Sequence, residues 1–211
     1  MDMYEIVAKN PLLAILRNVP LEKTEDYAQA VVDGGVRFFE VALNSPHGLE
    51  QITRLRKKFG DRCLVGAGTA VTVEKARAAL AAGAQFLLTP GTPWDVLEYC
   101  AENEVMLLPG VLTPTDVALC LEYGFKTMKL FPAGAMPRSY VKDLKGPFDE
   151  TNYMAIGGVK RENVGEFFDA GCISVGLASG LMPPGAVERC DWQACAGAVA
   201  ALRQAVEEKR G

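Results

Sequence analysis

The stretch Tyr123-Gly124-Phe125-Lys126-Thr127-Met128-Lys129-Leu130-Phe131 shows the unit from which the fold is expected to be built. A helical pattern ends at Tyr123-Gly124, and an apolar run that is typical of a buried strand follows at once. Glycine at such a point accepts the left-handed backbone conformation that closes a helix. The same order recurs along the chain, at Asp33-Gly34-Gly35, Ala82-Gly83 and Ala170-Gly171. This repetition predicts alternating helices and strands.

Eight apolar runs are expected as strands. They cover Leu12 to Leu16, Val36 to Leu43, Cys63 to Gly66, Gln85 to Thr89, Val105 to Leu108, Phe125 to Leu130, Tyr153 to Ile156 and Ile173 to Gly176. Continuous apolar strands that alternate with helices indicate a parallel sheet covered by helices. Eight such units in 211 residues predict a single-domain α/β protein, residues 1–211, with a compact (β/α)₈ TIM barrel. A doubly wound open sheet is the alternative. A short N-terminal helix over residues 2–10 precedes the barrel, and residues 191–209 are expected to form a closing helix.

Composition excludes several classes of partner and site. The net charge of −4 gives no indication of nucleic-acid or membrane binding. No transmembrane run or basic signal segment is present, which favours a cytoplasmic protein whose six cysteines are thiols. His47 is the single histidine and no Cys-x-x-Cys pair occurs, so a zinc site of the usual spacing is not expected. His47 itself is expected at the surface, at the start of a helix.

A lysine and a glutamate interrupt two of the apolar strands. Lys129 is the only charged residue near the end of its strand, and burial of an ammonium is costly because an apolar environment disfavours the charged form. Side chains alternate between the two faces of a strand, so Phe125, Thr127 and Lys129 should share the face that lines the barrel lumen. Glu40 occupies a similar position in its own strand. Both lie late in their strands, at the end where barrel enzymes place their catalytic groups.

Arg17 follows the first strand on the same face as Ile15, so it should join Lys129 and Glu40. An amine can condense with a keto acid to form an iminium that accepts electrons, a carboxylate can move protons, and a guanidinium can bind a carboxylate through two hydrogen bonds. The alternative is a buried structural salt bridge between Lys129 and Glu40, with Arg17 at a solvated rim.

Three glycine-containing turns are expected after strands three, seven and eight. Gly66-Ala67-Gly68-Thr69 could place a hydroxyl and backbone amides at the mouth of the site. Ile156-Gly157-Gly158-Val159 and Gly176-Leu177-Ala178-Ser179-Gly180 follow the last two strands. That is the usual phosphate-binding position in such barrels, where amides and a helix N-terminus face the anion. Glycine is also common in any tight turn between a strand and a helix, so each pair is weak evidence by itself.

These motifs together resemble those of a known enzyme family. In chain order they are Glu40-Val41-Ala42-Leu43-Asn44-Ser45-Pro46, Val65-Gly66-Ala67-Gly68-Thr69, Thr89-Pro90-Gly91, Leu108-Pro109-Gly110, Met128-Lys129-Leu130-Phe131-Pro132-Ala133 and Ile156-Gly157-Gly158-Val159. From Pro11 to Met182 the chain resembles the family of 2-keto-3-deoxy-6-phosphogluconate (KDPG) and 4-hydroxy-2-oxoglutarate (KHG) aldolases. The lysine and glutamate motifs carry most of the specificity.

The resemblance implies a class I aldolase (a lyase) on a (β/α)₈ barrel, usually a homotrimer, without metal or other cofactor. Its covalent chemistry would be a Schiff base on Lys129, with Glu40 as general acid/base. Its substrates would be a keto sugar acid, pyruvate and an aldehyde. The positions that it implies as substrate-binding are Thr69, Gly157, Gly158 and Ser179. Pro90, Phe131 and Ala178, from the motifs and turns quoted above, are also expected to bind substrate.

Two departures from the phosphogluconate branch are informative. Asn44 stands where that branch has an arginine, so Arg17 is the candidate for binding the substrate carboxylate. Ile156 stands where it has a threonine, and loss of a hydroxyl could alter the preference between C4 epimers. Asn44 and Ile156 are therefore included among the substrate-binding residues. Both changes resemble the 2-dehydro-3-deoxy-6-phosphogalactonate branch.

The expected reaction is cleavage of a 2-keto-3-deoxy-6-phospho sugar acid, galactonate or gluconate, to pyruvate and glyceraldehyde 3-phosphate. One alternative is cleavage of 4-hydroxy-2-oxoglutarate to pyruvate and glyoxylate. Two others come from different classes: a phosphosugar epimerase or isomerase, and a barrel that binds a sugar phosphate without catalysis. The single histidine counts against the metal-dependent epimerases, and the pairing of Lys129 with Glu40 counts against a passive binder.

Overall fold

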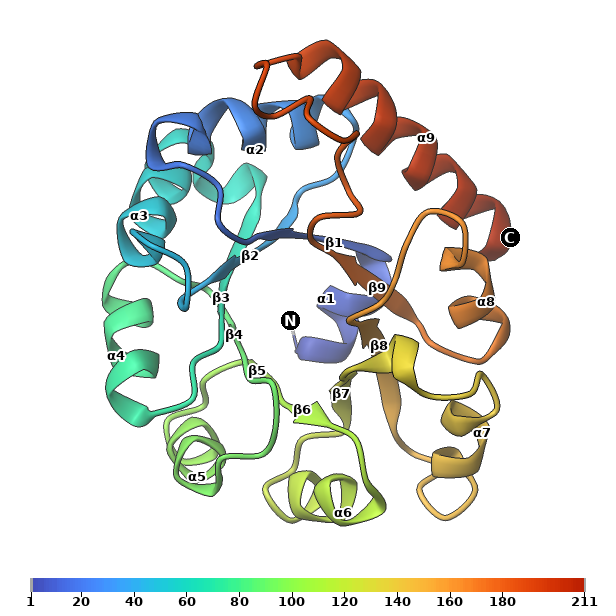
Figure 1. The fold of residues 1–211 in the computed structure, drawn as a ribbon. Coiled ribbons are helices and arrows are strands. Elements are labelled where there is room, and N and C mark those ends of the chain that lie inside the picture. The colour runs from blue at the N-terminus through green and yellow to red at the C-terminus, as the bar shows by residue number, and fades with distance from the viewer. Residues whose placement is uncertain (1, 211) are drawn as a thin grey trace.

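Parallel strands and helices alternate through residues 2–210, the part of the chain that this computed structural model describes (Figure 1). The strands are β1 (Leu12–Leu16), β2 (Phe38–Ala42), β3 (Leu64–Gly68), β4 (Leu87–Leu88), β5 (Leu107–Leu108), β6 (Gly110–Val111), β7 (Thr127–Leu130), β8 (Asn152–Ile156) and β9 (Ser174–Leu177). The α-helices are α1 (Met3–Lys9), α2 (Thr24–Asp33), α3 (Gly48–Phe59), α4 (Val73–Ala81), α5 (Trp94–Glu102), α6 (Pro114–Glu122), α7 (Tyr140–Lys145), α8 (Val164–Asp169) and α9 (Trp192–Arg210). Short 3₁₀ turns lie at Leu21–Lys23, Gly60–Arg62 and Ala133–Ala135.

The strands form one sheet in the order β5-β4-β3-β2-β1-β9-β8-β7-β6, and every recorded pair is parallel. The two ends of this order, β5 and β6, follow each other in the chain and are separated only by Pro109. The expected fifth strand is therefore one strand in two pieces, and the sheet curves into a barrel. The (β/α)₈ expectation is confirmed, and the open sheet is excluded.

Proline explains why the fifth strand is split. Pro109 has no N–H to donate to a neighbouring strand, but its carbonyl accepts a hydrogen bond from the amide of Lys129 at 2.8 Å. Before it β5 pairs with β4, and after it β6 pairs with β7. The Thr89 hydroxyl accepts a hydrogen bond from the Gly110 amide at 3.2 Å, which ties β6 to the end of β4. Pro109-Gly110 therefore interrupts the strand without ending it, and the strand continues to Val111.

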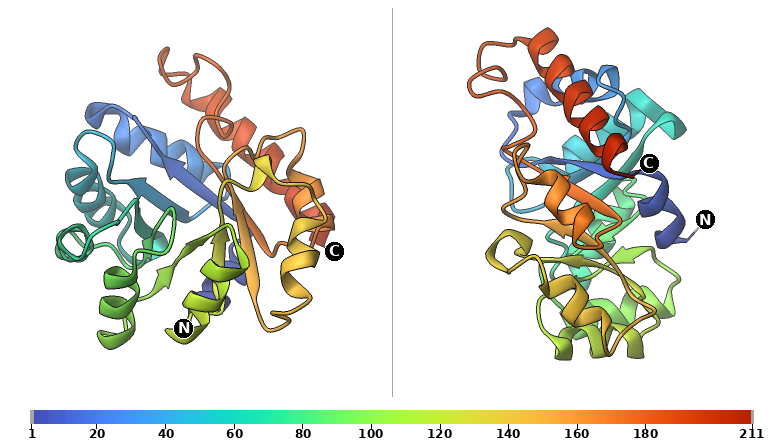
Figure 2. Two further views of the ribbon diagram at one scale, coloured as in Figure 1. Left: turned by 60° about the horizontal axis from the view of Figure 1, so that its bottom comes forward. Right: turned by 90° about the vertical axis from the view of Figure 1, so that its right-hand side faces the viewer.

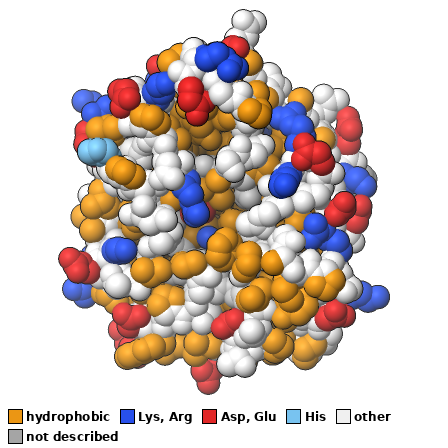
Figure 3. Space-filling model, in the orientation of Figure 1, with side chains coloured by type: hydrophobic (Ala, Val, Ile, Leu, Met, Phe, Trp, Pro, Cys, Tyr) orange, Lys and Arg blue, Asp and Glu red, His pale blue; other side chains and the backbone are white. Residues whose placement is uncertain are grey.

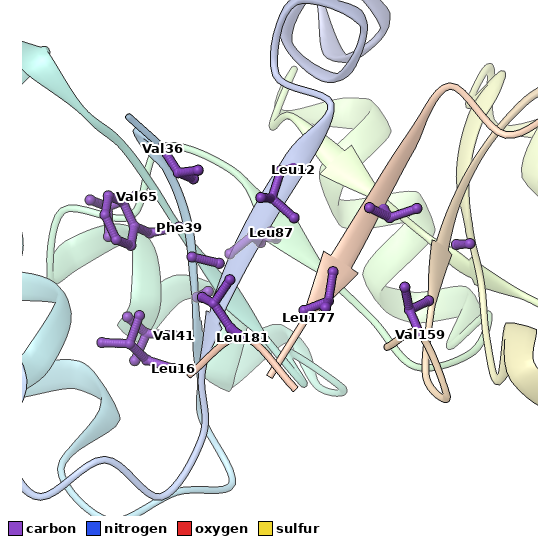
Figure 4. Packing of buried hydrophobic residues seen from close by; sticks show 14 of the residues in the cluster. Leu12, Leu16, Val36, Phe39, Val41, Val65, Leu87, Val159, Leu177 and Leu181 are labelled. Carbon is purple, nitrogen blue, oxygen red and sulfur yellow. The ribbon is translucent and has the colours of Figure 1, made fainter. Parts of the chain in front are cut away.

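Two apolar layers cover the two faces of the sheet. The outer layer lies between strands and helices and includes Leu12, Leu16, Val41 and Val65 (Figure 4). The lumen layer consists of the buried residues Ile6, Val7, Leu13, Ile15, Phe38, Phe86, Leu88, Leu108, Met154 and Ile156. Alternate residues of a strand belong to different layers, as the period of two requires. Leu13 and Ile15 therefore share the lumen layer, whereas Met128 and Leu130 share the outer layer.

Helix α1 lies across the amino ends of the strands. Figures 1 and 2 place it behind the barrel when the molecule is viewed from the carboxyl ends. Its buried residues Ile6 and Val7 belong to the lumen layer, so α1 closes this end of the barrel. Asp2 caps the helix by accepting a hydrogen bond from the Glu5 amide at 2.8 Å. The expected short helix before the barrel is confirmed, and so is the closing helix, α9.

Two smaller expectations differ from the structure. Phe125 precedes β7 and packs against the outer layer, so it does not share the lumen face with Thr127 and Lys129. Strand β3 extends through Gly68, so Gly66-Ala67-Gly68 is strand rather than turn. Glycine within a strand often marks a close approach of another group, which is the case here. Within residues 2–210, no helix is both long enough and apolar enough to cross a bilayer.

Candidate active site

The carboxyl ends of the strands carry the charged groups that the sequence singles out. Figure 3 shows this face, on which basic side chains lie at the central hollow while most other charged groups lie around the edge. Lys129 is 3 % exposed and Glu40 is fully buried, so both lie deep in the barrel. Arg17, Asn44 and Ser179 are exposed at the mouth. The site is therefore layered, with two reactive groups at the bottom and polar groups at the rim.

Lys129 extends from β7 into the lumen. Its strand partners are Gly110 on β6 and Met154 on β8, and Met154 belongs to the lumen layer. The Lys129 ammonium nitrogen lies 5.0 Å from the centre of the Phe131 ring, a cation–π distance. No ion pair or conventional hydrogen bond holds Lys129 Nζ within the described residues 2–210. An amine in this setting is available to a carbonyl substrate.

Glu40 extends from β2 on the opposite side of the lumen, with β1, β9 and β8 between its strand and that of Lys129. Both carboxylate oxygens are buried, and neither has a hydrogen-bond partner among residues 2–210. A direct salt bridge between Lys129 and Glu40 is therefore not formed, which counts against the structural alternative. A buried carboxylate without partners costs folding free energy, and such groups are often retained because chemistry requires them.

A cleft of about 320 Å³ opens beside Phe131 at the mouth of the barrel. It brings together most of the expected substrate-binding residues, namely Arg17, Phe131, Ile156, Gly157, Gly158, Ala178 and Ser179. Arg17 makes no hydrogen bond or ion pair with the described part of the chain. Because Lys129 lies against Phe131 and Phe131 lines the cleft, the buried amine and the cleft are adjacent.

Free backbone amides line one side of this cleft. Gly157 and Gly158 have φ angles of 85° and 75°, which only glycine adopts easily. The amides of Gly158, Ser179 and Gly180 donate no hydrogen bond to any described residue, so they remain available to an anion. The expected helix N-terminus is not present here, since α8 begins only at Val164 and turns follow β9. An anion at this position would be held by these amides and the Ser179 hydroxyl.

Hydrogen bonds join the three loops on the other side of the mouth. The Thr69 hydroxyl donates to Asn44 Oδ1 at 3.3 Å, and Ser45 Oγ accepts from the Asn18 amide at 3.0 Å. Thr69 has a φ of 61°, a strained conformation for a β-branched residue. A strained backbone conformation persists only where the surrounding structure stabilises it. The loops after β1, β2 and β3 thus form one connected rim.

Pro90 lies at the exposed start of the loop after β4, in close contact with the Gly110 backbone. Sequence reasoning missed two residues that organise this region. Thr89 is fully buried, and its hydroxyl donates to the Gly91 carbonyl at 2.7 Å in addition to accepting from Gly110. Gly68 lies directly under the Glu40 carboxylate. Two features of the sequence could have indicated them. Thr89 stands directly before Pro90-Gly91, and Gly66 and Gly68 are one residue apart, so they lie on the same face of their strand.

The remaining nucleophiles and metal ligands do not gather at the site. The described cysteines are free thiols, and burial raises the pKa of Cys100, Cys120 and Cys172 to about 12. These thiols are therefore protonated and unreactive near neutral pH. His47 is exposed at the start of α3, 4.0 Å from a Glu50 oxygen. Within residues 2–210, no group of three His, Cys, Asp or Glu side chains could hold a metal ion.

This arrangement suits the chemistry of a carbonyl compound that also bears an anion. The buried amine can add to a ketone, and the carboxylate across the lumen can accept or return a proton. The amides and the guanidinium at the mouth can bind the charged ends of the same molecule.

Comparison with known proteins agrees with this geometry. A family model described as KDPG and KHG aldolase matches residues 3–198. The chain is 36 % identical over 201 residues to 2-dehydro-3-deoxy-6-phosphogalactonate aldolase of Escherichia coli K12, covering 94 % of this chain and 98 % of that protein. It is 35 % identical over 153 residues to 2-dehydro-3-deoxy-phosphogluconate aldolase of Treponema pallidum, covering 71 % and 72 %.

A solved structure gives the same fold. KDPG aldolase from Legionella pneumophila, with pyruvate captured as a covalent carbinolamine intermediate, superposes with a TM-score of 0.86 and 28 % identity. The match covers 93 % of this chain and 96 % of that one.

Proposed function

The chain belongs to the family of KDPG and KHG aldolases, which are class I aldolases, and on that premise we propose that it cleaves a 2-keto-3-deoxy-6-phospho sugar acid to pyruvate and glyceraldehyde 3-phosphate. The observation that carries this proposal is the buried Lys129 amine beside a cleft lined by free amides and an unpaired arginine. In such a substrate the ketone would meet the Lys129 amine, the phosphate would meet the amides, and the carboxylate would meet the arginine.

The proposed reaction begins with attack of Lys129 Nζ on the C2 ketone. Loss of water from the resulting carbinolamine gives an iminium at C2, adjacent to C3, which can accept electrons from the C3–C4 bond. Glu40, directly or through water, takes the proton of the C4 hydroxyl, and the electrons of the C3–C4 bond pass into the iminium. Glyceraldehyde 3-phosphate leaves, the enamine is protonated at C3, and hydrolysis releases pyruvate and the free lysine. No redox partner or metal is required by this sequence.

The residues at the mouth of the barrel are proposed to bind the two charged ends of the substrate. Arg17 is proposed to pair with the substrate carboxylate, as the cation that can take over where Asn44 replaces the arginine of the phosphogluconate branch. Thr69, with its hydroxyl directed to Asn44, is proposed to bind near the same carboxylate. The amides of Gly158 and Ser179, together with the Ser179 hydroxyl, are proposed to hold the phosphate. Pro90 and Phe131 would shape the walls, and Ala178 would keep the phosphate end narrow.

We favour the galactonate epimer as substrate. Ile156 is 4 % exposed, lines the cleft and presents only carbon to it. A site without a hydroxyl at this position loses one hydrogen bond that could select the gluconate C4 hydroxyl.

The test is a comparison of initial rates with the two epimers and with 4-hydroxy-2-oxoglutarate, alongside borohydride trapping of pyruvate and peptide mapping. The proposal expects one adduct, on Lys129, and the highest kcat/KM for the galactonate epimer. A higher kcat/KM for the gluconate epimer would reverse the choice of epimer while leaving the mechanism intact. Absence of any adduct would refute the aldolase mechanism.

Replacement of Ser179 by alanine tests the phosphate subsite. The Ser179→Ala variant is expected to raise KM for phosphorylated substrates about 10- to 100-fold, because one hydrogen bond to a charged group contributes about 1.5–3 kcal/mol. KM for 4-hydroxy-2-oxoglutarate, which has no phosphate, should change little. Steady-state kinetics with both substrates measures the difference, and equal changes would argue against a phosphate contact.

A homotrimer in the cytoplasm completes the proposal. Trp94, at the start of α5, is 63 % exposed and offers a large apolar surface that a second subunit could cover. Light scattering of the purified protein distinguishes the trimer from a monomer.

A further inference from the structure

Two glycines on the lumen face of β3 make room for the side chains of Glu40, on β2, and of Phe86, directly before β4. Gly66 and Gly68 are separated by one residue, so they point to the same face of the sheet. Neither is among the residues with positive φ. Their backbone conformation is thus accessible to any residue, and the requirement for glycine must come from the space above them.

The space above Gly68 is filled by Glu40. A Cβ atom at Gly68 would lie 1.7 Å from Glu40 Oε1, 2.4 Å from Cδ and 2.7 Å from Cγ. The whole carboxyl arm therefore lies flat over the Gly68 Cα. Glu40 pairs in register with Gly66, so this contact is diagonal, from β2 to the next lumen-facing position of β3.

No polar group of the described residues holds the Glu40 carboxylate in this place. Both oxygens lack a hydrogen-bond partner among residues 2–210. Catalytic carboxylates are usually oriented by hydrogen bonds from neighbouring groups. Here the orientation has to come from shape, and Gly68 is the surface on which the carboxylate rests.

We infer that Gly68 is a positioning residue, which sets the direction of the Glu40 carboxylate toward the reacting carbons by leaving room for it. This inference rests on the proposed role of Glu40 in the aldolase reaction. Proton transfer requires the base to lie about 2.6–3.2 Å from the proton donor, or one water away. A displacement of about 1 Å can lower a rate roughly 100-fold. Any side chain at Gly68 has to move Glu40 by at least such a distance.

The experiment replaces Gly68 by alanine and measures two steps separately. Gly68→Ala is expected to lower kcat about 100-fold for cleavage of the phosphorylated substrate. Trapping of pyruvate on Lys129 by borohydride should stay near the wild-type level, because Lys129 lies on β7 across the lumen. A merely structural defect would lower trapping and turnover together.

Gly66→Ala is the matched control. It adds the same methyl group to the same face of the same strand, but there the new atom meets the Phe86 ring at 2.3 Å instead of a carboxylate. Gly66→Ala is expected to unfold at a lower temperature than the wild-type protein. The ratio of pyruvate trapping to turnover, each measured per folded molecule, should stay at the wild-type value.

A double-mutant cycle tests the contact itself and remains informative if Gly68→Ala folds poorly. In the Glu40→Ala background the carboxyl arm is absent, so Gly68→Ala should no longer lower the unfolding temperature. Equal losses of stability in both backgrounds, or parallel losses of trapping and turnover in Gly68→Ala, would overturn the inference. If the wild-type protein itself traps no pyruvate, the proposed function fails first. If wild type is active and Glu40→Gln is not, but Gly68→Ala is fully active, only the positioning role fails.

Discussion

Lys129→Ala is expected to abolish both turnover and the borohydride-trapped pyruvate adduct. The reaction as proposed passes entirely through a covalent bond to this nitrogen, so no other residue of the site can share its role. The amine lies at the end of a strand, 3 % exposed and against the Phe131 ring. Intact mass spectrometry after incubation with pyruvate and borohydride measures the adduct, and coupled detection of pyruvate release measures turnover.

Two further variants make this result specific. Lys129→Met keeps the apolar stem that packs in the lumen and removes only the amine, so it should be equally inactive but more stable than Lys129→Ala. Lys126→Ala is the control, since Lys126 lies three residues earlier, is 58 % exposed and pairs with Glu150 outside the lumen. It should keep full trapping and full turnover. An adduct of normal yield in Lys129→Met, formed on another lysine, would contradict the assignment.

Glu40→Gln is expected to lower turnover by about 10²–10⁴-fold, the usual contribution of a general acid/base. The amide has almost the same shape, so it fits over Gly68 without a new clash, but it cannot accept the proton of the C4 hydroxyl. Formation of the lysine adduct with pyruvate should be slowed less than cleavage. Single-turnover kinetics of cleavage, compared with the yield of the trapped adduct, separates the two steps.

Glu40→Gln should be more stable than the wild-type protein, although it is less active. The Glu40 carboxylate is fully buried and both of its oxygens lack partners, so the charge is costly in the folded state. Glu40→Gln removes the charge and should raise the unfolding temperature, a trade between stability and activity that is common at active sites. A variant that is both fully active and more stable would show that Glu40 is not the proton carrier.

Much of the fold could be predicted from local patterns. Helix-closing glycines such as Gly83 and Gly124, each followed by a buried strand, led to the barrel and to most element positions within a few residues. The period of two placed Lys129 and Glu40 in the lumen, because a strand that buries Met128 and Leu130 against helices must turn Lys129 the other way. Short elements were less well predicted, since the run expected from Gln85 to Thr89 is strand only at Leu87–Leu88.

The sequence by itself determined the alternation of helices and strands and the face to which each charged side chain belongs, because both follow from interactions within a few residues. Only the tertiary structure decided how the barrel closes at Pro109, where β5 pairs with β4 and β6 with β7. It alone brought Arg17 into one cleft with Ser179, and it alone laid Glu40 over Gly68. These contacts join residues far apart in the chain, and their geometry depends on the curvature and packing of the whole sheet, which no local pattern encodes.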